Sequence, residues 1–287
     1  MGEWVLGVIG GSGLYDIAGL QDARWVEIDT PWGAPSDALL TGTLGALRLW
    51  FLPRHGRGHR LSPTDVNARA NIAALKIAGC TDLVSLSAVG SLREALDPGT
   101  FVVVDQFIDR TFARDKSFFG PGLVAHVSMA HPTCPRLSAL AAEAGREAGA
   151  RLVEGGTYLA MEGPQFSTRA ESELYRQWGC HVIGMTNMPE AKLAREAQLP
   201  YASVAMVTDY DCWHEDIAHV EVAQIIACLL DNAAKARDLV ARLAAKLQGA
   251  REASPIDSAL ADAIITAPAA RDPAMVEKLK AIAGGAL

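Results

Sequence analysis

The chain lacks the marks of several protein classes. Its 287 residues include five cysteines, an odd and widely spaced set without a C-x-x-C pair, which fits reduced thiols better than a disulfide framework. No apolar run approaches the roughly 18 residues that a membrane helix needs. The N-terminus has no basic segment and reaches Gly10 too early for a signal peptide. We therefore expect a soluble cytoplasmic protein that does not span a membrane.

Positive charge is also scarce. Lysine and arginine number 26 against 33 aspartates and glutamates, for a formal net charge of −7. This balance argues against nucleic acid or an anionic membrane as the main partner. A small anion stays open as a ligand, because it needs only a local cluster of donors. The length allows one large α/β domain or two small ones, and no repeat, low-complexity tract or linker precedes Gln248.

Short apolar, β-branched runs alternate with helical patterns. The expected strands are residues 4–9, 47–52, 83–86, 101–104, 158–161, 181–184 and 201–207. The expected helices are residues 67–78, 136–148, 169–178, 189–197 and 222–246. Glycines at 79, 149 and 179 follow three of these helices. Such alternation predicts an α/β fold with a largely parallel or mixed sheet that helices cover on both faces.

The character of the chain changes from Gly249 onward. Ser254-Pro255 breaks the long helix, and two short helical pieces are expected near residues 257–265 and 273–282. This appendage could serve as a lid, as an oligomer contact or as plain surface.

Two glycine-rich turns follow expected strands. The Gly10-Gly11-Ser12-Gly13 turn can aim backbone N–H groups at an anion, but a simple tight turn explains it almost as well. The segment PRHGRGHR, residues 53–60, sets five cationic or titratable side chains among glycines. It predicts an anion site, with a solvated basic loop as the plain alternative. A metal site is disfavoured, because the glycines oppose the helix that would place His55 and His59 on one face.

Two carboxylates stand where another expected strand ends. Asp209 and Asp211 follow the apolar run 201–207, at the edge of the sheet where open α/β proteins bind ligands. Carboxylates there suit a ligand that offers N–H donors or needs a proton, and the 6-amino group and N7 of adenine meet both descriptions. A pair of solvated loop carboxylates is the plain alternative.

Three further segments offer polar or planar contacts. Residues 85–91 end a strand with small hydroxyl side chains, and Phe166 with Ser167 can hold a planar ring. Thr186 stands at a helix N-terminus, where it can donate to an anion. Val222, Ile225 and Ile226 form an apolar stripe of the kind that ordinarily belongs to a helix core.

Taken in order, these segments resemble the S-methyl-5′-thioadenosine phosphorylases of the trimeric purine nucleoside phosphorylase family. The resemblance runs from about Val5 to Ala245 and includes GVIGGSGLYD, PRHGRGH, SAVGSLRE, DQFIDRT, EGPQFSTRAES, MTNMPEAKLARE and TDYDCW. It implies one α/β domain over residues 1–248, with a twisted, partly barrel-like mixed sheet flanked by helices. It also implies a homotrimer that needs no metal and no organic cofactor. Residues 249–287 lie outside the resemblance, as an appendage of unknown role.

The resemblance also implies a role for each matching residue. Phosphate, the co-substrate, is expected at Ser12, Arg54, His55, Ser87 and Thr186, and the ribose hydroxyls at the Met185 backbone. The base is expected against Ala88, Phe166 and Ser167, with Asp209 and Asp211 on its N7 and N6 edge. The 5′-methylthio group is expected against Val222, Ile225 and Ile226, with His126 reaching in from a neighbouring subunit.

This reading gives phosphorolysis a simple chemical logic. Cleavage of the N-glycosidic bond builds positive charge on the sugar, which phosphate stabilises, and negative charge on the purine. A protonated Asp209 neutralises the purine by donating to N7 as general acid. That role requires a raised pKa, which burial against Phe166 is expected to supply.

Three other functions stay open. A 6-oxopurine nucleoside phosphorylase, or one acting on methylthioinosine, faces an O6 acceptor that carboxylates repel. A nucleotide-dependent dehydrogenase could use Gly11, Gly13 and Asp29, but Asp16 replaces the third glycine of its fingerprint. A nucleoside-binding sensor would bind the same ligand without releasing adenine.

Overall fold

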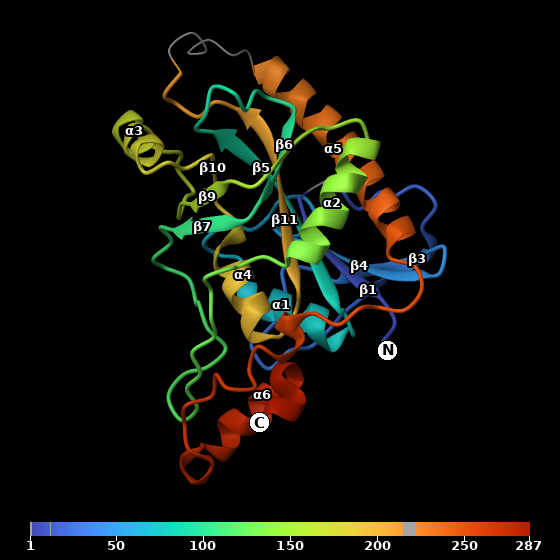
Figure 1. Cartoon of the computed structure of the whole chain (residues 1–287), viewed down its shortest axis with the longest axis vertical. Helices are drawn as coiled ribbons and strands as arrows, with labels where there is room; N and C mark the ends of the chain where they lie inside the picture. The colour runs from blue at the N-terminus through green and yellow to red at the C-terminus, as the bar shows by residue number, and fades with distance from the viewer. Residues whose placement is uncertain (1, 12, 215–221) are drawn as a thin grey trace.

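Eleven strands of the described residues form one mixed sheet (Figure 1). The computed structural model describes residues 2–11, 13–214 and 222–287, with the backbone alone for 222–226. The strands are β1 (Val5–Gly10), β2 (Gln21–Val26), β3 (Leu39–Leu44), β4 (Leu47–Pro53), β5 (Asp82–Ser91), β6 (Thr100–Val104), β7 (Gln106–Asp109), β8 (Arg151–Glu154), β9 (Thr157–Ala160), β10 (Val182–Gly184) and β11 (Tyr201–Asp209). Their order is β2-β3-β4-β1-β5-β10-β9-β7, with β11, β6 and β8 branching from β5.

Strand β5 is the centre of the sheet. It runs parallel to β1 through Asp82–Ser85 and parallel to β11 through most of its length. Its final residues, Gly90 and Ser91, pair antiparallel with β10. Its apolar residues alternate between two cores on opposite faces, as expected of a strand that helices cover on both sides.

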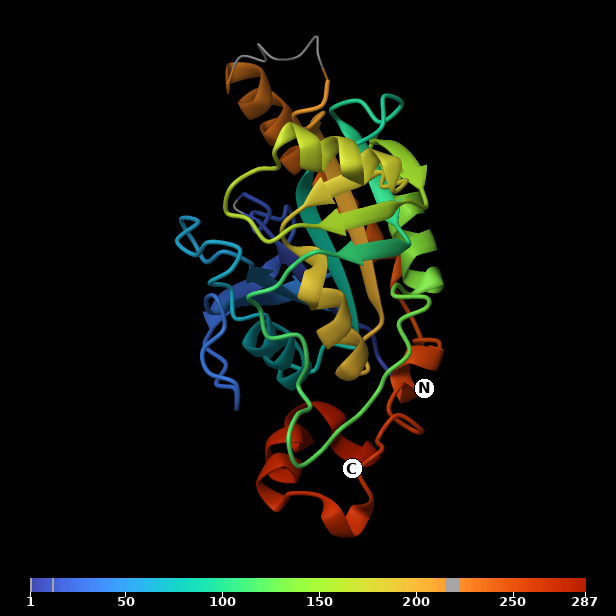
Figure 2. The same cartoon turned by 90° about the vertical axis from the view of Figure 1, so that its left-hand side faces the viewer.

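Helices cover both faces (Figures 1 and 2). They are α1 (Ala68–Ile77), α2 (Pro135–Glu147), α3 (Arg169–Gln177), α4 (Asn187–Glu196), α5 (Val222–Lys246) and α6 (Pro273–Ala283). Helices α1, α4 and α6 contribute to one core, and α2 and α5 to the other. Helix α3 packs Tyr175 with Trp213 in a smaller third cluster. The predicted α/β fold with a mixed, helix-covered sheet is confirmed. No helix among the described residues is long and apolar enough to cross a membrane.

Local signals explain where several helices begin and end. Asn67 caps α1 by accepting a hydrogen bond from the Ala70 N–H, and Thr168 forms a capping box with Glu171 at α3. The expected glycines after α1, α2 and α3 all adopt positive φ, which only glycine does without strain.

Some elements differ from expectation. Strands β2, β3, β7 and β8 are not among the expected strands. The residues of β2 are mostly exposed, and β7 and β8 have only four residues each. The helix expected at residues 257–265 is wrong. A 3₁₀ turn, Pro255–Ser258, forms there instead, hydrogen-bonded turns follow over residues 259–263, and Ile264 then pairs antiparallel with Ala125.

The C-terminal residues pack against a long connection between β7 and α2. This connection, residues 110–132, is called the strap below, and Figures 1 and 2 show it descending beside the red C-terminal helices. The Ile265 N–H donates to the Val124 carbonyl at 2.9 Å, and the His126 N–H donates to the Ala263 carbonyl at 2.8 Å. Leu279 of α6 is fully buried in the core that α1 and α4 share.

Candidate active site

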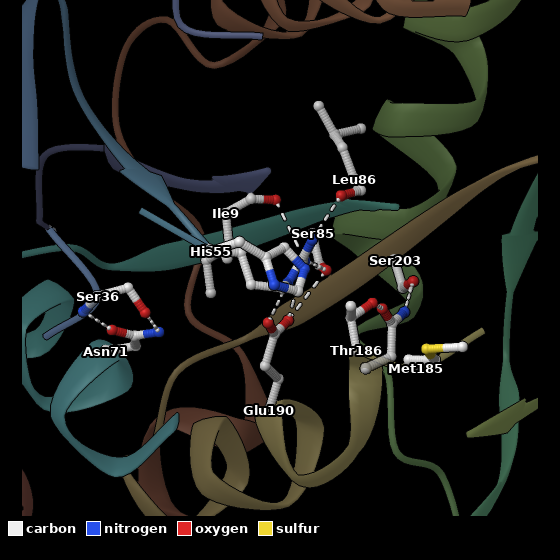
Figure 3. Close-up of polar contacts among 12 residues, drawn as sticks. Ile9, Ser36, His55, Asn71, Ser85, Leu86, Met185, Thr186, Glu190 and Ser203 are labelled. Carbon is white, nitrogen blue, oxygen red and sulfur yellow. Dashed lines mark hydrogen bonds and ion pairs between the residues drawn. The ribbon is translucent and has the colours of Figure 1, made fainter. Parts of the chain in front are cut away.

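One cavity brings together four of the predicted site residues. Arg54 and His55 follow β4, while Met185 and Thr186 lie in the turn between β10 and α4. The full lining is Arg54, His55, Pro63, Val66, Ala68, Arg114, Met185, Thr186, Pro189 and Glu190. Figure 3 shows His55, Thr186 and Glu190 around this space, with Ser85 of β5 beside them.

Arg54 forms a buried ion pair on the wall of the cavity. Its Nε donates to Glu190 Oε1 at 2.5 Å, and its Nη2 donates to Ser85 Oγ at 2.7 Å. Its Nη1 donates to the Leu86 carbonyl at 3.0 Å. Burial lowers the pKa of Arg54, but Glu190 outweighs burial and leaves the pKa raised. Arg54 therefore stays charged, and among the described residues one Nη1 N–H has no partner and can reach an anion.

His55 is neutral and held in one tautomer. Burial and the neighbouring Arg54 charge lower its pKa to about 4. Its Nδ1 lies 3.0 Å from the Leu61 carbonyl, which can only accept, so Nδ1 carries the proton. Nε2 is consequently an acceptor, suited to a protonated phosphate oxygen. The His55 and His59 rings stack with centroids 4.4 Å apart, and no cluster of three or more metal-binding side chains occurs in the described part of the chain.

Hydroxyl groups complete this end of the site. Ser87 Oγ is buried beside the Tyr158 hydroxyl, and no described residue reaches it within normal hydrogen-bond length. The Tyr158 hydroxyl lies 3.4 Å from Thr186 Oγ1. A buried hydroxyl without a partner is uncommon in a folded protein and is satisfied when a ligand oxygen arrives.

Arg114 and Glu162 form a second buried ion pair that the sequence analysis missed. Glu162 accepts from Arg114 Nε at 2.9 Å and from the Phe112 and Ala113 N–H groups at 2.6 and 3.1 Å. Burial alone raises the pKa of Glu162, but these donors lower it to about 2. No local pattern points to Arg114, because its partners lie about 50 to 70 residues further along the chain.

The two predicted aspartates lie together at the end of β11. Asp209 Oδ1 accepts from the Asp211 N–H at 2.8 Å, and Oδ2 accepts from Thr208 Oγ1 at 2.7 Å. Gly90 of β5 makes this possible: a Cβ there would lie 3.0 Å from Asp209 Oδ1 and 3.3 Å from Asp211 Cβ. Asp209 pairs with Gly90 and Ala205 pairs with Ser87, so the carboxylates lie three residues, or about 10 Å, along β5 from the Ser87 hydroxyl.

Asp211 is a half-buried carboxylate with a raised pKa. Burial, followed by the negative charge of Asp209, raises its pKa even though nearby serine hydroxyls oppose the shift. Its Oδ2 is buried, and no described residue forms a hydrogen bond of normal length with it. An N–H donor on a ligand, or a proton, would satisfy this oxygen.

The side chains expected around the base lie near this pair in different ways. Ser167 is buried and its carbonyl accepts from Cys212 Sγ at 3.3 Å, which ties its loop to the turn after β11. Phe166 is 83 % exposed, so the expected burial of Asp209 against this ring is not found. Ser167 turns inward in its place, with its hydroxyl 3.7 Å from Met161 Sδ. Ala88 of β5 is exposed, as a contact residue for a ligand must be.

The remaining predicted residues are less well defined. Ser12 lies outside the described residues, and the side chains of Val222, Ile225 and Ile226 do too, although their backbone begins α5. His126 is exposed on the strap, far along the chain from either half of the site.

Comparisons with known proteins show the family of this chain. The sequence pattern described as the phosphorylase superfamily matches residues 5–246. A protein from Cereibacter sphaeroides named S-methyl-5′-thioadenosine phosphorylase is 64 % identical over 285 residues, covering 99 % of this chain and 98 % of the relative. A protein of the same name from Rhodospirillum rubrum is 62 % identical over 285 residues, covering 99 % and 97 %.

Solved structures show the same likeness. A methylthioadenosine phosphorylase from an Antarctic soil metagenomic library superposes with a TM-score of 0.93 at 45 % identity, covering 98 % of this chain and 99 % of its own. A mutant adenosine/methylthioadenosine phosphorylase from Schistosoma mansoni, solved with methylthioadenosine, gives a TM-score of 0.78 at 36 % identity, covering 85 % and 92 %.

Proposed function

The chain belongs to the phosphorylase superfamily and, within it, to the S-methyl-5′-thioadenosine phosphorylase family, and we propose that it cleaves S-methyl-5′-thioadenosine with inorganic phosphate. The products are adenine and 5-methylthioribose 1-phosphate. One observation carries the proposal: the unsatisfied Ser87 hydroxyl lies three residues, or about 10 Å, along β5 from Gly90, beside which the aspartate pair keeps an unsatisfied oxygen. A nucleoside and a phosphate, placed end to end, bridge such a span.

The phosphate occupies the cavity beside Arg54. Ser87 and Thr186 supply hydroxyl groups, Ser12 supplies a third, and the free N–H of Arg54 supplies a charged donor. His55 Nε2 accepts from the protonated oxygen that monohydrogen phosphate retains. The bound anion then lies next to the sugar as positive charge develops there, which lowers the barrier. The Met185 backbone holds the ribose hydroxyls.

The base lies at the aspartate pair, with Ala88, Phe166 and Ser167 as its other contacts. The orphaned Oδ2 of Asp211 accepts from the 6-amino group. Asp209 delivers a proton to N7 as the glycosidic bond breaks. The Asp211 N–H donates to Asp209 Oδ1 at 2.8 Å, and burial together with the negative charge of Asp209 raises the pKa of Asp211.

The 5′ end of the nucleoside lies where two subunits meet. Val222, Ile225 and Ile226 line the 5′-methylthio pocket, and His126 of a neighbouring subunit completes it, so the active form is a homotrimer. The enzyme acts in the cytoplasm on a nucleoside and phosphate, without a metal or an organic cofactor and without nucleic acid or membrane partners.

The competing substrates are 6-oxopurine nucleosides and methylthioinosine. Their O6 would face the orphaned Asp211 oxygen and leave two acceptors opposite each other, which a carboxylate pair disfavours.

A substrate panel tests the proposal. Methylthioadenosine, adenosine, methylthioinosine and inosine are each incubated with the enzyme, with and without phosphate, and the free base is measured. We expect adenine from methylthioadenosine, only when phosphate is present. Preference for the 6-oxo compounds would favour the competing function, and binding without turnover would favour a sensor.

A further inference from the structure

We infer that Arg114 is a positioning residue that aligns the phosphate site with the ribose site, an inference that rests on the proposed function. The arginine lines the cavity, and its side chain is only 5 % exposed. It lies on the strap, away from every motif that the sequence analysis assigned to the site.

The hydrogen bonds of Arg114 use its whole guanidinium group. Nε donates to Glu162 Oε1 at 2.9 Å, Nη1 to the carbonyls of Met185 and Met188 at 2.6 and 2.8 Å, and Nη2 to the carbonyls of Glu162 and Met161 at 2.5 and 3.4 Å. Five N–H groups thus meet five acceptors. No N–H is left for phosphate, so Arg114 acts through the residues that it holds.

Those residues belong to the two segments that must face the sugar and the phosphate. Met161 and Glu162 follow β9, while Met185 and Met188 flank Thr186 at the start of α4. A trans peptide points its C=O and N–H in opposite directions, so fixing the Met185 carbonyl also fixes the Thr186 N–H. One side chain therefore sets the spacing of the ribose contact at Met185 and the phosphate contact at Thr186.

The variant Arg114→Lys tests this inference, because lysine keeps the charge but has only three N–H groups for five acceptors. We expect kcat to fall about tenfold or more and the KM for phosphate to rise by a similar factor, since misplacing reacting groups by about 1 Å is costly. The KM for the nucleoside should rise by a smaller factor than that for phosphate, because Arg114 holds its ribose contact at Met185 while the aspartate pair lies on other elements.

Arg195→Lys is the matched control. Arg195 of α4 donates to the Ser128 carbonyl at 2.8 Å and to the His131 carbonyl, both on the strap, without lining the cavity. The Arg195→Lys variant should lose arginine–carbonyl hydrogen bonds, as Arg114→Lys does, and keep wild-type kinetics. Arg114→Lys kinetics within twofold of wild type, or equal losses in both variants, would overturn the inference.

If the Arg114→Lys protein does not fold, a second variant and a second readout still test the inference. Glu162→Gln leaves the four carbonyl acceptors of Arg114 in place, but it removes the negative charge and sets an amide NH2 against N–H donors of Phe112 and Ala113 or of Arg114. A smaller rise in the phosphate KM than in Arg114→Lys is expected, and an unchanged KM would count against the role. Thermal shifts with phosphate alone report binding without turnover, and a selective loss of the phosphate shift is expected. A wild-type enzyme that releases no adenine would refute the proposed function instead, because the Arg114 comparison starts from an active wild type.

Discussion

At the scale of single residues, two buried arginines flank the cavity, and each is neutralised by its own glutamate. Arg54 pairs with Glu190 and Arg114 with Glu162, and both pairs are nearly free of solvent. The protein therefore keeps fixed positive groups at the proposed phosphate site without leaving an unpaired charge in the core. Such pairs are costly to break, because the remaining partner stays buried and charged.

Arg54→Ala should therefore change both stability and catalysis. Urea unfolding should show a loss of about 3–5 kcal/mol, as Glu190 is left unpaired. The KM for phosphate should rise and kcat should fall. The double variant Arg54→Met with Glu190→Met should regain stability but not phosphate affinity. An Arg54→Ala enzyme with a wild-type KM for phosphate would show that Arg54 does not bind phosphate.

Replacing the aspartates with asparagines should change which base is preferred. Asp209→Asn with Asp211→Asn should lower kcat/KM for methylthioadenosine and raise, relative to it, kcat/KM for methylthioinosine, because an amide can donate to O6. Asp209→Asn alone should reduce kcat most, by roughly 10²–10⁴-fold, since it removes the proposed acid. If the ratio between the two nucleosides stays constant across the variants, the aspartates do not read the base.

At the scale of elements, helix α4 contacts both the cavity proposed for phosphate and the strap. Its first turn carries Thr186 as N-cap, and Glu190 holds Arg54 one turn later. Further along, Lys192 Nζ binds Asp109 Oδ2 at 2.5 Å, and Glu196 accepts from Ser117 Oγ and the Phe118 N–H, each at 2.7 Å. Glu190 and Glu196 therefore lie on the same regular part of α4, which begins after the non-helical residue Met188.

Glu196 should make this connection sensitive to pH. Burial raises its pKa to about 7, although the Phe118 N–H and the Ser117 hydroxyl lower it in part. The folded state then holds the proton more tightly than the unfolded state, so stability falls as pH rises from about 4.5 to about 7. Glu196→Gln should gain stability relative to wild type between pH 5 and pH 8 in urea unfolding. An equal difference at both pH values would contradict this assignment.

The first turns of α5 should decide the 5′ specificity. If Val222, Ile225 and Ile226 form an apolar wall, adenosine buries its 5′-hydroxyl without a partner, at a cost of roughly 1–3 kcal/mol. Wild-type kcat/KM should then favour methylthioadenosine over adenosine, and Val222→Asp should narrow or reverse that preference. Equal kcat/KM for both nucleosides in the wild-type enzyme would indicate that these three residues belong to an ordinary helix core and do not contact the 5′ group.

Elements with a strong periodic pattern could be predicted from the sequence, and so could site residues that follow buried strands. Helix α1 and strand β11 lie within one or two residues of their expected bounds, and Arg54, His55 and Thr186 meet in one cavity as expected. Contacts that depend on tertiary structure could not be predicted. Arg114 gives no local signal, because its acceptors come together only when the sheet forms, and β2 lacks the alternation of a half-buried strand.

At the scale of the whole molecule, the C-terminal residues and the strap form one packed unit beside the sheet (Figure 2). Arg251 Nε binds the fully buried Asp82 of β5 at 2.5 Å, and Leu260 and Ile282 join the core of α1 and α4. Because the strap carries His126, we propose that residues 249–287 support the segment that reaches a neighbouring subunit.

The assembly should be trimeric in solution. Light scattering should report three chains in each assembly. Each active site should then need His126 from a neighbouring chain. Truncation after Gln248 should lower stability, because it uncovers apolar core residues and leaves Asp82 with Arg136 as its remaining ion-pair partner. A fully active monomer would refute the trimer, and a truncated protein with wild-type stability and assembly would refute the supporting role.

The most direct measurement of the central claim is the product balance of one reaction. The enzyme is mixed with methylthioadenosine and a known amount of phosphate, and adenine, sugar phosphate and remaining phosphate are quantified over time. We predict that one phosphate disappears for each adenine released, that 5-methylthioribose 1-phosphate forms in equal amount, and that omitting phosphate stops adenine release. Adenine that appears without phosphate consumption, or no adenine at all, would contradict the account.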